Sequence, residues 1–175
     1  RDLYGSPRFA QILKALDETG GERLRFATSH PKDLSDEVIA QFGSLRSLMP
    51  ALHLPAQSGS DRILQLMNRR YTSAHYRQLV SKLRDACPDI ALSTDIIVGF
   101  PGETEKDFMD TARLVDEIGY HQVFTFIYSK REGTPAASME DNTPHEVIQK
   151  RFDRLVDIVQ AHAFEKNQLD LGATI

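Results

Sequence analysis

Four short apolar runs alternate along the chain with longer segments of helical periodicity. The runs span residues 24–28, 51–57, 90–98 and 122–129. Runs that are apolar almost throughout are typical of parallel strands that are covered on both faces. The pattern therefore predicts an α/β fold with a parallel sheet and right-handed crossovers. Four strands are too few to close a barrel by themselves, and periodicity does not decide between an open sheet and part of a barrel.

The helical segments carry their own start and stop signals. Residues suited to N-caps precede the apolar stripes, at Ser35, Thr72, Thr104 and Thr143. Thr104 and Asp107 have the spacing of a capping box. An opening helix is expected over residues 9–17, and the last helix is expected to end near residue 165. The predicted order is α-β-α-β-α-α-β-α-β-α.

Polar residues gather where the strands are expected to end. The second run leads into Gln57-Ser58-Gly59-Ser60, and the third leads into the turn 99–103. In parallel α/β folds, ligands bind at the carboxyl ends of the strands. The first turn is either an ordinary strand-to-helix turn with Ser60 as the N-cap or a cradle for a ribose or a carboxylate. The glycines of the second turn either form the turn alone or let a ligand approach the backbone.

Several side chains near the strand ends could carry chemistry without belonging to a motif. Asp95 falls on a buried strand, so it is either a structural hydrogen-bond centre or a ligand contact. His30 and His53 lie at or near strand ends, and with Asp95 they would suit a metal-dependent hydrolase. Neither histidine sits in a metal-ligand motif, so we interpret both as packing or loop residues. Lys130 and Arg131 could meet an anion or be solvated.

Composition narrows the class of protein. The chain has 175 residues, of which 41% are hydrophobic and 26% are charged, and its net charge is −4. These values are typical of a globular domain and argue against an autonomous nucleic-acid binder. The single cysteine, Cys87, excludes an internal disulfide and a metal cluster held by this chain's thiolates alone. No apolar run approaches the ~20 residues that span a bilayer, so we expect a cytoplasmic protein that does not contact a membrane.

Five ordered blocks carry a resemblance that covers nearly the whole chain. They read RFATSHP at 25–31, LHLPAQSGSDRIL at 52–64, MNRRYT at 67–72, STDIIVGFPGET at 93–104 and GTPAA at 133–137. In this order they resemble the methylthiotransferases of the radical S-adenosylmethionine (SAM) superfamily, most closely the branch that modifies tRNA. That branch adds a methylthio group to carbon 2 of an isopentenylated adenosine. Sister branches act on a threonylcarbamoyl adenosine or on a ribosomal protein.

The resemblance implies a partial (β/α) barrel of six strands, of which this chain supplies the last four. Residues 1–166 would be the C-terminal part of the radical SAM domain, and residues 167–175 would begin a linker to an RNA-binding module. In the full-length parent, S-adenosylmethionine would lie beside a 4Fe-4S cluster, whose electron generates a 5′-deoxyadenosyl radical, and tRNA would be the partner. The family's cluster-binding cysteines lie outside this sequence, which begins with Arg1 rather than Met. The isolated chain is therefore expected to be an inactive fragment.

The resemblance also implies which residues would bind the cofactor. They are Gln57, Ser58, Ser60, Asp95, Ile97, Gly99, Glu103 and Tyr128. The first three would line the ribose and methionine side, and Ile97 would lie beside the adenine, whose edge would meet the backbone near Tyr128. The resemblance assigns no catalytic residue and no metal ligand to this chain. A non-catalytic ligand-binding domain with the same sheet is the alternative to an enzyme.

A strand over residues 24–28 at the start of the sheet would have an unpaired edge. Unpaired strand edges readily pair with other strands. We therefore expect another segment, or a second copy of the chain in a self-associated form, to cover this edge.

Overall fold

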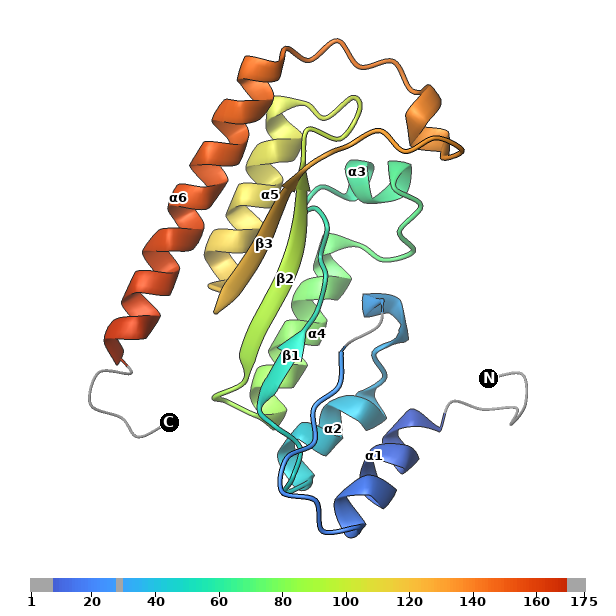
Figure 1. Ribbon diagram of the computed structural model, residues 1–175, viewed down its shortest axis with the longest axis vertical. Helices are drawn as coiled ribbons and strands as arrows, with labels where there is room; N and C mark the ends of the chain where they lie inside the picture. The colour runs from blue at the N-terminus through green and yellow to red at the C-terminus, as the bar shows by residue number, and fades with distance from the viewer. Residues whose placement is uncertain (1–7, 28–29, 170–175) are drawn as a thin grey trace.

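The computed structural model describes residues 8–27 and 30–169, and its described part contains one parallel sheet. The strands are β1 (Ala51–His53), β2 (Ala91–Val98) and β3 (Gln122–Ile127), in the spatial order β1-β2-β3 (Figure 1). Both neighbouring pairs are parallel, and Asp95 of β2 lies opposite Phe124 of β3. The predicted parallel α/β architecture is therefore confirmed.

The prediction of a regular strand over residues 24–28 is wrong. Within the described part of this run, Leu24 makes only an isolated parallel bridge with Leu48. Phe26 packs against the ring of Phe42 in the neighbouring helix, at a centroid distance of 5.7 Å. The apolar side chains are thus used to pack against helices rather than to extend the sheet. The end of the run lies outside the described residues, and the cover expected over its edge stays a prediction.

β1 is shorter than the predicted run 51–57. Pro55 has no N–H to donate to a ladder, and regular pairing ends before it. The chain nevertheless continues beside β2. The Gln57 N–H donates to the Asp95 carbonyl at 2.8 Å, and the Gln57 carbonyl accepts from the Ile97 N–H at 2.9 Å. These bonds fix the turn after β1 to the end of β2.

Six α-helices and two 3-10 turns accompany the strands in the described part of the chain. They are α1 (Phe9–Glu18), η1 (Pro31–Asp33), α2 (Asp36–Ser44), α3 (Asp61–Leu66), α4 (Ser73–Ala86), α5 (Glu105–Ile118), η2 (Pro135–Ser138) and α6 (His145–Leu169). Ser35, Thr72 and Thr104 each accept a backbone N–H of the first helical turn, so these predicted caps are confirmed. α6 ends later than predicted, at Leu169. None of the described helices has the length and hydropathy needed to cross a bilayer.

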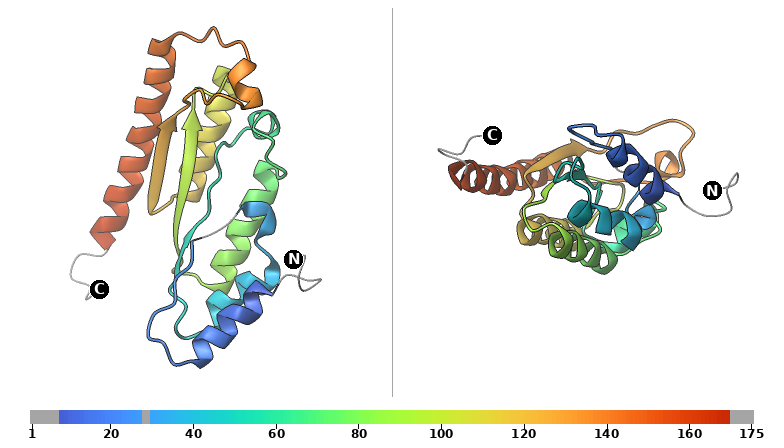
Figure 2. Two further views of the ribbon diagram at one scale, coloured as in Figure 1. Left: turned by 45° about the vertical axis from the view of Figure 1, so that its right-hand side comes forward. Right: turned by 90° about the horizontal axis from the view of Figure 1, so that it is seen from below.

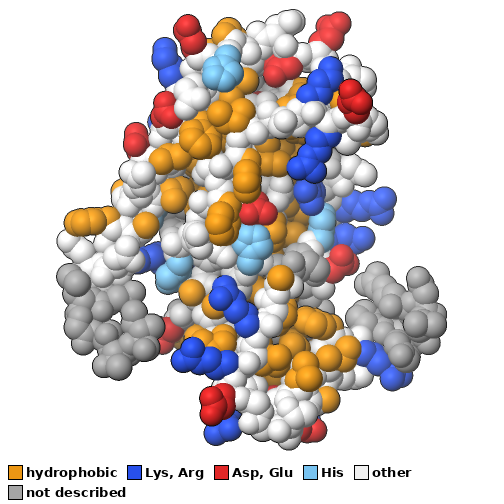
Figure 3. Space-filling model, viewed as in Figure 1, with side chains coloured by type: hydrophobic (Ala, Val, Ile, Leu, Met, Phe, Trp, Pro, Cys, Tyr) orange, Lys and Arg blue, Asp and Glu red, His pale blue; other side chains and the backbone are white. Residues whose placement is uncertain are grey.

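One face of the sheet is covered by helices, and the other is open. α4 and α5 lie behind the strands in Figure 1, and α6 runs beside β3 (Figures 1 and 2). Buried and half-buried residues alternate along β2, so Leu92 and Ile96 face the helices while Asp95 and Ile97 face the open side. Hydrophobic side chains gather over the open face (Figure 3). The predicted cover on both faces is therefore wrong for the part of the chain that the structure describes.

Buried tyrosines hold the segment that follows β1. The Tyr76 hydroxyl donates to the Leu54 carbonyl at 2.6 Å, and the Tyr71 hydroxyl donates to the Ala56 carbonyl at 2.9 Å. Burial raises the pKa of Tyr71 to about 12. A buried carbonyl without a partner is costly, so these bonds restrict the backbone to one path toward the next turn.

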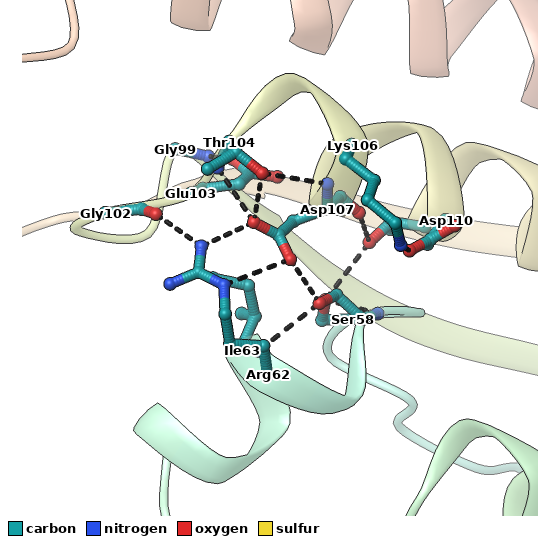
Figure 4. Close-up of polar contacts among 12 residues, drawn as sticks. Ser58, Arg62, Ile63, Gly99, Gly102, Glu103, Thr104, Lys106, Asp107 and Asp110 are labelled. Atoms are coloured by element: carbon teal, nitrogen blue, oxygen red, sulfur yellow. Dashed lines mark hydrogen bonds and ion pairs between the residues drawn. The ribbon is translucent and has the colours of Figure 1, made fainter.

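A buried carboxylate joins α3 to the start of α5 (Figure 4). Asp107 of α5 accepts hydrogen bonds from the Ser60 hydroxyl at 2.6 Å, from the Thr104 N–H at 2.9 Å and from the Arg62 guanidinium. Burial alone would raise the pKa of Asp107. The hydrogen bonds from Arg62, Ser60 and Thr104 outweigh that effect and hold the pKa well below its usual range. The carboxylate is therefore charged and fixes the two helices at the carboxyl end of the sheet.

Asp107→Asn is expected to lower the free energy of unfolding at pH 7 by about 2 kcal/mol. The amide preserves the size of the side chain but loses the charge that Arg62 pairs with. Urea denaturation followed by circular dichroism measures the change. Asp110→Asn on the same helix is the matched control, because that partly exposed carboxylate pairs with Lys106 and Arg113 and is worth less than about 0.5 kcal/mol. Equal losses in the two variants would contradict the stabilising role of the buried network.

Candidate functional site

A cleft of about 760 Å³ opens at the carboxyl ends of the strands. Its walls come from the turn after β1, the α3–α4 loop, the open face of β2, and the end of β3 with the loop to η2. The lining residues are Gln57, Leu66, Met67, Asn68, Arg69, Asp95, Ile97, Phe100, Phe126, Ile127, Tyr128, Ser129, Arg131, Thr134, Pro135 and Ala136. A cleft of this volume with apolar walls and a few polar groups is typical of a site for a small molecule or cofactor.

Gln57 occupies a strained position in this cleft. Its backbone has a φ of +66°, in the left-handed region that favours glycine. The side chain is buried and lines the cleft. Its backbone is paired with Asp95 and Ile97 of β2. Backbone strain of about 1 kcal/mol at a residue other than glycine is a common mark of a functional position.

Asp95 and Ile97 enter the cleft from the open face of β2. The Asp95 side chain is 29% exposed, and its carboxylate lies 3.5 Å from Nε2 of His53. The same histidine has its Nδ1 3.0 Å from the Ser93 hydroxyl. Asp95 is thus no fully buried hydrogen-bond centre, which favours the ligand-contact interpretation of the two that the sequence leaves open. Ile97 pairs with Phe126 of β3, and together they form an apolar wall.

Tyr128 contributes an unpaired polar group. Its N–H donates to the Val98 carbonyl at 2.8 Å, so the backbone continues the pairing of β3. Its ring meets Phe100 edge-on at a centroid distance of 5.1 Å. The hydroxyl is buried and has no hydrogen-bond partner among the described residues. A buried hydroxyl beside a cleft pays a desolvation cost that a ligand acceptor could remove.

Ser58 and Ser60 lie outside this cleft, on its supporting side. Both are buried. The Ser58 hydroxyl is 3.0 Å from the Thr111 hydroxyl, and the Gly59 N–H donates to the same oxygen at 2.9 Å. Ser60 caps α3 and donates to Asp107. It also borders a second hollow, of about 520 Å³, whose charged side chains include the Arg62–Asp107 pair. The structure therefore places both serines in contacts that hold the turn.

Gly99 and Glu103 also hold a turn rather than line the cleft. Gly99 has a φ of +72°, and a Cβ there would lie 2.6 Å from Ile148 of α6. Its N–H donates to the Glu103 carboxylate. Burial raises the pKa of Glu103 to about 7, although the Gly99 N–H and the Arg151 guanidinium favour the charged form. Arg151 of α6 donates to the Glu103 carbonyl at 3.1 Å and to the Glu105 carboxylate at 3.1 Å, which ties α6 to the end of β2.

Sequence reasoning missed several residues of the cleft. Phe126 falls within a predicted strand, and its pairing with Ile97 could have identified it had the register been known. Met67 and Arg69 reach the cleft from the α3–α4 loop; they belong to the block at 67–72, to which the sequence assigns no role at the site. Arg131, considered as an anion contact, does line the cleft.

The metal-site alternative finds no support in the described residues. Within residues 8–27 and 30–169, no group of three His, Cys, Asp or Glu side chains could hold a metal ion. His30 meets Tyr71 edge-on at 5.0 Å and accepts a hydrogen bond from the Lys32 N–H. His53 pairs with Asp95 instead.

Comparison with known proteins supports the resemblance drawn from the sequence blocks. The family model described as the radical SAM superfamily matches residues 2–115. Curated relatives named tRNA-2-methylthio-N(6)-dimethylallyladenosine synthase, from Clostridium botulinum, Acetivibrio thermocellus and Thermobifida fusca, are 52%, 48% and 46% identical over 96%, 100% and 99% of this chain. The chain spans 38%, 37% and 36% of the length of these three relatives.

A solved structure shares the fold. Coproporphyrinogen III oxidase (HemN) from Escherichia coli, described as a radical SAM enzyme, matches with a TM-score of 0.66 at 16% identity, over 89% of this chain and 37% of that one. The parallel sheet is therefore a partial barrel of the radical SAM type, in which three of the four predicted strands are formed within the described residues. By its sequence match and by its fold, the chain belongs to the radical SAM superfamily.

Proposed function

We propose that this chain forms the cofactor-binding part of a tRNA methylthiotransferase, which adds a methylthio group to carbon 2 of N6-dimethylallyladenosine. The observation that carries the proposal is the match to relatives of that name, at 46–52% identity over 96–100% of this chain. The chain spans only 36–38% of those relatives. The tRNA contacts and the cluster ligands are accordingly proposed for the whole protein.

The cleft suits S-adenosylmethionine. Ile97 and Phe126 offer an apolar wall for the adenine, and Gln57 and Asp95 offer polar groups for the ribose and methionine side. The unpaired Tyr128 hydroxyl offers a hydrogen-bond donor. When bound beside a reduced iron–sulfur cluster, S-adenosylmethionine supplies radical chemistry at C–H bonds. The residues of this chain bind the molecule and orient it across the strand ends.

The described residues do not fit the iron–sulfur cluster. Such clusters are held by several cysteine thiolates. Cys87 is the only cysteine of the chain, and it follows α4 at the amino end of β2, opposite the cleft. Burial raises the pKa of its thiol, which disfavours the thiolate. In this proposal the cluster ligands come from other parts of the whole protein.

Four of the expected cofactor-binding residues position the cofactor indirectly, because they hold the turns that line its cleft. They are Ser58, Ser60, Gly99 and Glu103. The serines fix the turn that starts at Gln57. Glu103 holds the turn after β2 and receives Arg151 from α6. We assign these four residues to positioning and the four that line the cleft to contact.

The substitution Gln57→Gly tests the binding of S-adenosylmethionine separately from the stability of the fold. Glycine relieves the left-handed strain while it removes the buried side chain, so the free energy of unfolding is expected to change by less than about 1 kcal/mol. Loss of the amide is expected to weaken S-adenosylmethionine binding about tenfold, as measured by calorimetry on this chain. Gln57→Asn keeps a shorter amide and tolerates the same backbone. Its affinity for S-adenosylmethionine should therefore lie between those of the wild type and Gln57→Gly. Unchanged affinity in Gln57→Gly would contradict the assigned contact.

Glu103 gives the chain a pH-dependent stability. Because the pKa of about 7 lies above the ordinary value of 4.5, the folded chain keeps a proton that the unfolded chain releases. The contribution of Glu103 to the free energy of unfolding is complete below about pH 4.5, and it is lost as the pH rises through 7. Relative to Glu103→Gln, the wild-type chain is expected to lose about 2–3 kcal/mol between pH 5 and pH 8. Urea denaturation across this range measures the difference.

Glu105→Gln is the control for the Glu103 experiment. Glu105 is exposed and binds the same arginine, so its substitution should leave the pH profile of stability parallel to that of the wild type. A difference between the wild type and Glu103→Gln that stays constant with pH would argue against a raised pKa.

A chimaera tests the proposed activity directly. This chain replaces the matching 169 residues of the Clostridium botulinum relative, which differ from it at about half of the positions. The chimaera is produced in a strain that lacks its own methylthiotransferase, and tRNA nucleosides are measured by mass spectrometry. We expect 2-methylthio-N6-dimethylallyladenosine to be restored, and to fall at least about tenfold with Gln57→Gly in the chimaera. A folded chimaera that restores none would overturn the proposal.

A further inference from the structure

Two arginines border the cofactor cleft from two separate loops. Arg69 belongs to the α3–α4 loop and Arg131 to the loop between β3 and η2, and both line the cleft. Arg69 is half-buried, and Arg131 is exposed. Figure 3, viewed as Figure 1, shows Lys and Arg side chains gathered at the upper right, over η2 and α3. We call Arg69 and Arg131 the arginine pair, which places positive charge at the mouth of the cleft.

A local turn fixes the backbone of each arginine. α3 ends in a Schellman motif, in which Asn68 has a φ of +55° and the Arg69 N–H donates to the Leu64 carbonyl at 2.8 Å. The Arg131 carbonyl accepts from the Thr134 hydroxyl at 2.8 Å and from the Thr134 N–H at 3.3 Å. Both long side chains therefore start from defined positions, which limits the conformational entropy that is lost when they bind a ligand.

The positive charge of the arginine pair is not neutralised within the described residues. None of the ion pairs in residues 8–27 and 30–169 includes Arg69 or Arg131. Asp95 is the only carboxylate among the described residues that line the cleft, and it lies 3.5 Å from Nε2 of His53. The mouth of the cleft thus carries a local charge opposite in sign to the net charge of −4 of the chain, which suits an anionic ligand.

We propose that the arginine pair binds the phosphodiester groups next to the nucleotide whose base enters the cleft. This inference rests on the proposed function, in which a nucleobase of RNA reacts beside the cofactor. A base reaches such a site by leaving its stack, and its sugar–phosphate backbone remains at the mouth. Arginine suits phosphate oxygens, because its planar guanidinium can donate two parallel hydrogen bonds to them.

Charge complementarity favours RNA over the cofactor as the ligand of the arginine pair. S-adenosylmethionine carries a sulfonium and an ammonium group besides its carboxylate, so its net charge is positive and two free guanidinium groups repel the molecule as a whole. An RNA strand carries a negative charge at every linkage, so both arginines gain from its approach. Contacts with phosphates fix the position of a strand without reading its bases. The arginine pair therefore sets where the nucleotide lies over the cofactor.

RNA binding to the chimaera tests the arginine pair. The probe is a synthetic RNA hairpin with N6-dimethylallyladenosine in its loop, and fluorescence anisotropy measures its Kd at several salt concentrations. Arg69→Gln and Arg131→Gln are each expected to weaken binding about three- to tenfold at low salt. Each should also lower the slope of log Kd against log salt by about 1, because one phosphate contact is lost.

The chain offers a matched control for each arginine. Arg70 and Lys130 are the exposed sequence neighbours of Arg69 and Arg131, and neither lines the cleft. Arg70→Gln and Lys130→Gln remove the same charge and are expected to change the Kd by less than about twofold. Equal losses in the variants and their controls would overturn the inference, as would a wild-type chimaera that does not bind the hairpin.

A neutral linkage in the hairpin identifies the phosphate. A methylphosphonate replaces the linkage on the 5′ or the 3′ side of the target nucleotide. At the contacted linkage, Arg69→Gln or Arg131→Gln should cause no further loss of affinity, since both changes remove the same interaction. Losses that add for both arginines at both linkages would overturn the inference.

Two further measurements distinguish the other ligands of an arginine. Calorimetry with S-adenosylmethionine on this chain is expected to give the wild-type affinity within about twofold for both variants. A tenfold fall together with unchanged RNA binding would assign the arginine pair to the carboxylate of the cofactor and overturn the inference. Chimaera variants that unfold more easily yet bind the hairpin normally would assign it to a carboxylate elsewhere in the whole protein, and would also overturn the inference.

The activity of the chimaera separates failure of this inference from failure of the proposed function. With Arg69→Gln or Arg131→Gln, we expect kcat/KM for tRNA to fall about as much as the affinity for the hairpin, mainly through KM. An active chimaera whose KM is unchanged by both substitutions overturns the inference and leaves the function standing. A chimaera that modifies no tRNA overturns the function, and the binding measurements then decide the role of the arginine pair by themselves.

Discussion

Side chains of β2 alternate between a helix-covered face and an open face, and this alternation decides where chemistry can lie. Leu92 and Ile96 seal the core, while Asp95 and Ile97 reach the cleft from the other side. A shift of the strand by one residue would bury the Asp95 carboxylate and expose Ile96, at a cost of several kcal/mol. Pairing on both edges of β2 and the apolar contacts with the helices oppose that shift.

The carboxyl end of β2 needs further support, because regular pairing stops there. Asp107 ties α3 to α5 on one side, and Glu103 receives Arg151 from α6 on the other. Both carboxylates are buried, yet their environments act in opposite directions. Asp107 is held charged by several donors, whereas the pKa of Glu103 is raised to about 7 because desolvation exceeds its few favourable contacts. The first therefore acts as a fixed support, and the second makes the support of the turn sensitive to pH.

Much of the fold follows from local signals in the sequence. The caps at Ser35, Thr72 and Thr104 are visible because a side-chain acceptor precedes an apolar stripe, and each is found in place. The apolar run at residues 24–28 misleads because strand periodicity does not distinguish a sheet edge from a segment that packs on helices. Its partner at Leu48 lies in a stretch without a strand signal.

The location of the candidate site could be predicted from the sequence, but the roles of its individual side chains could not. The turns after β1 and β2 carry the polar residues expected at the carboxyl ends of parallel strands, yet Ser58, Ser60 and Glu103 turn their polar atoms toward the protein. Which side of a turn a hydroxyl faces depends on tertiary partners such as Thr111 and Asp107, far away in the chain. The contribution of Phe126 depends on the register between β2 and β3, which no local pattern contains.

Two unfavourable features of the described residues lie at the cleft. Gln57 is held in a left-handed conformation, and the Tyr128 hydroxyl is buried without a partner among the described residues. Such costs are common at sites that bind a ligand, because a ligand can supply a missing hydrogen bond. The Tyr128 hydroxyl lacks a polar partner, which the ribose or the adenine of a cofactor could provide. Gln57 lines the same cleft, so the strained backbone and the unpartnered hydroxyl lie where the proposed cofactor would bind.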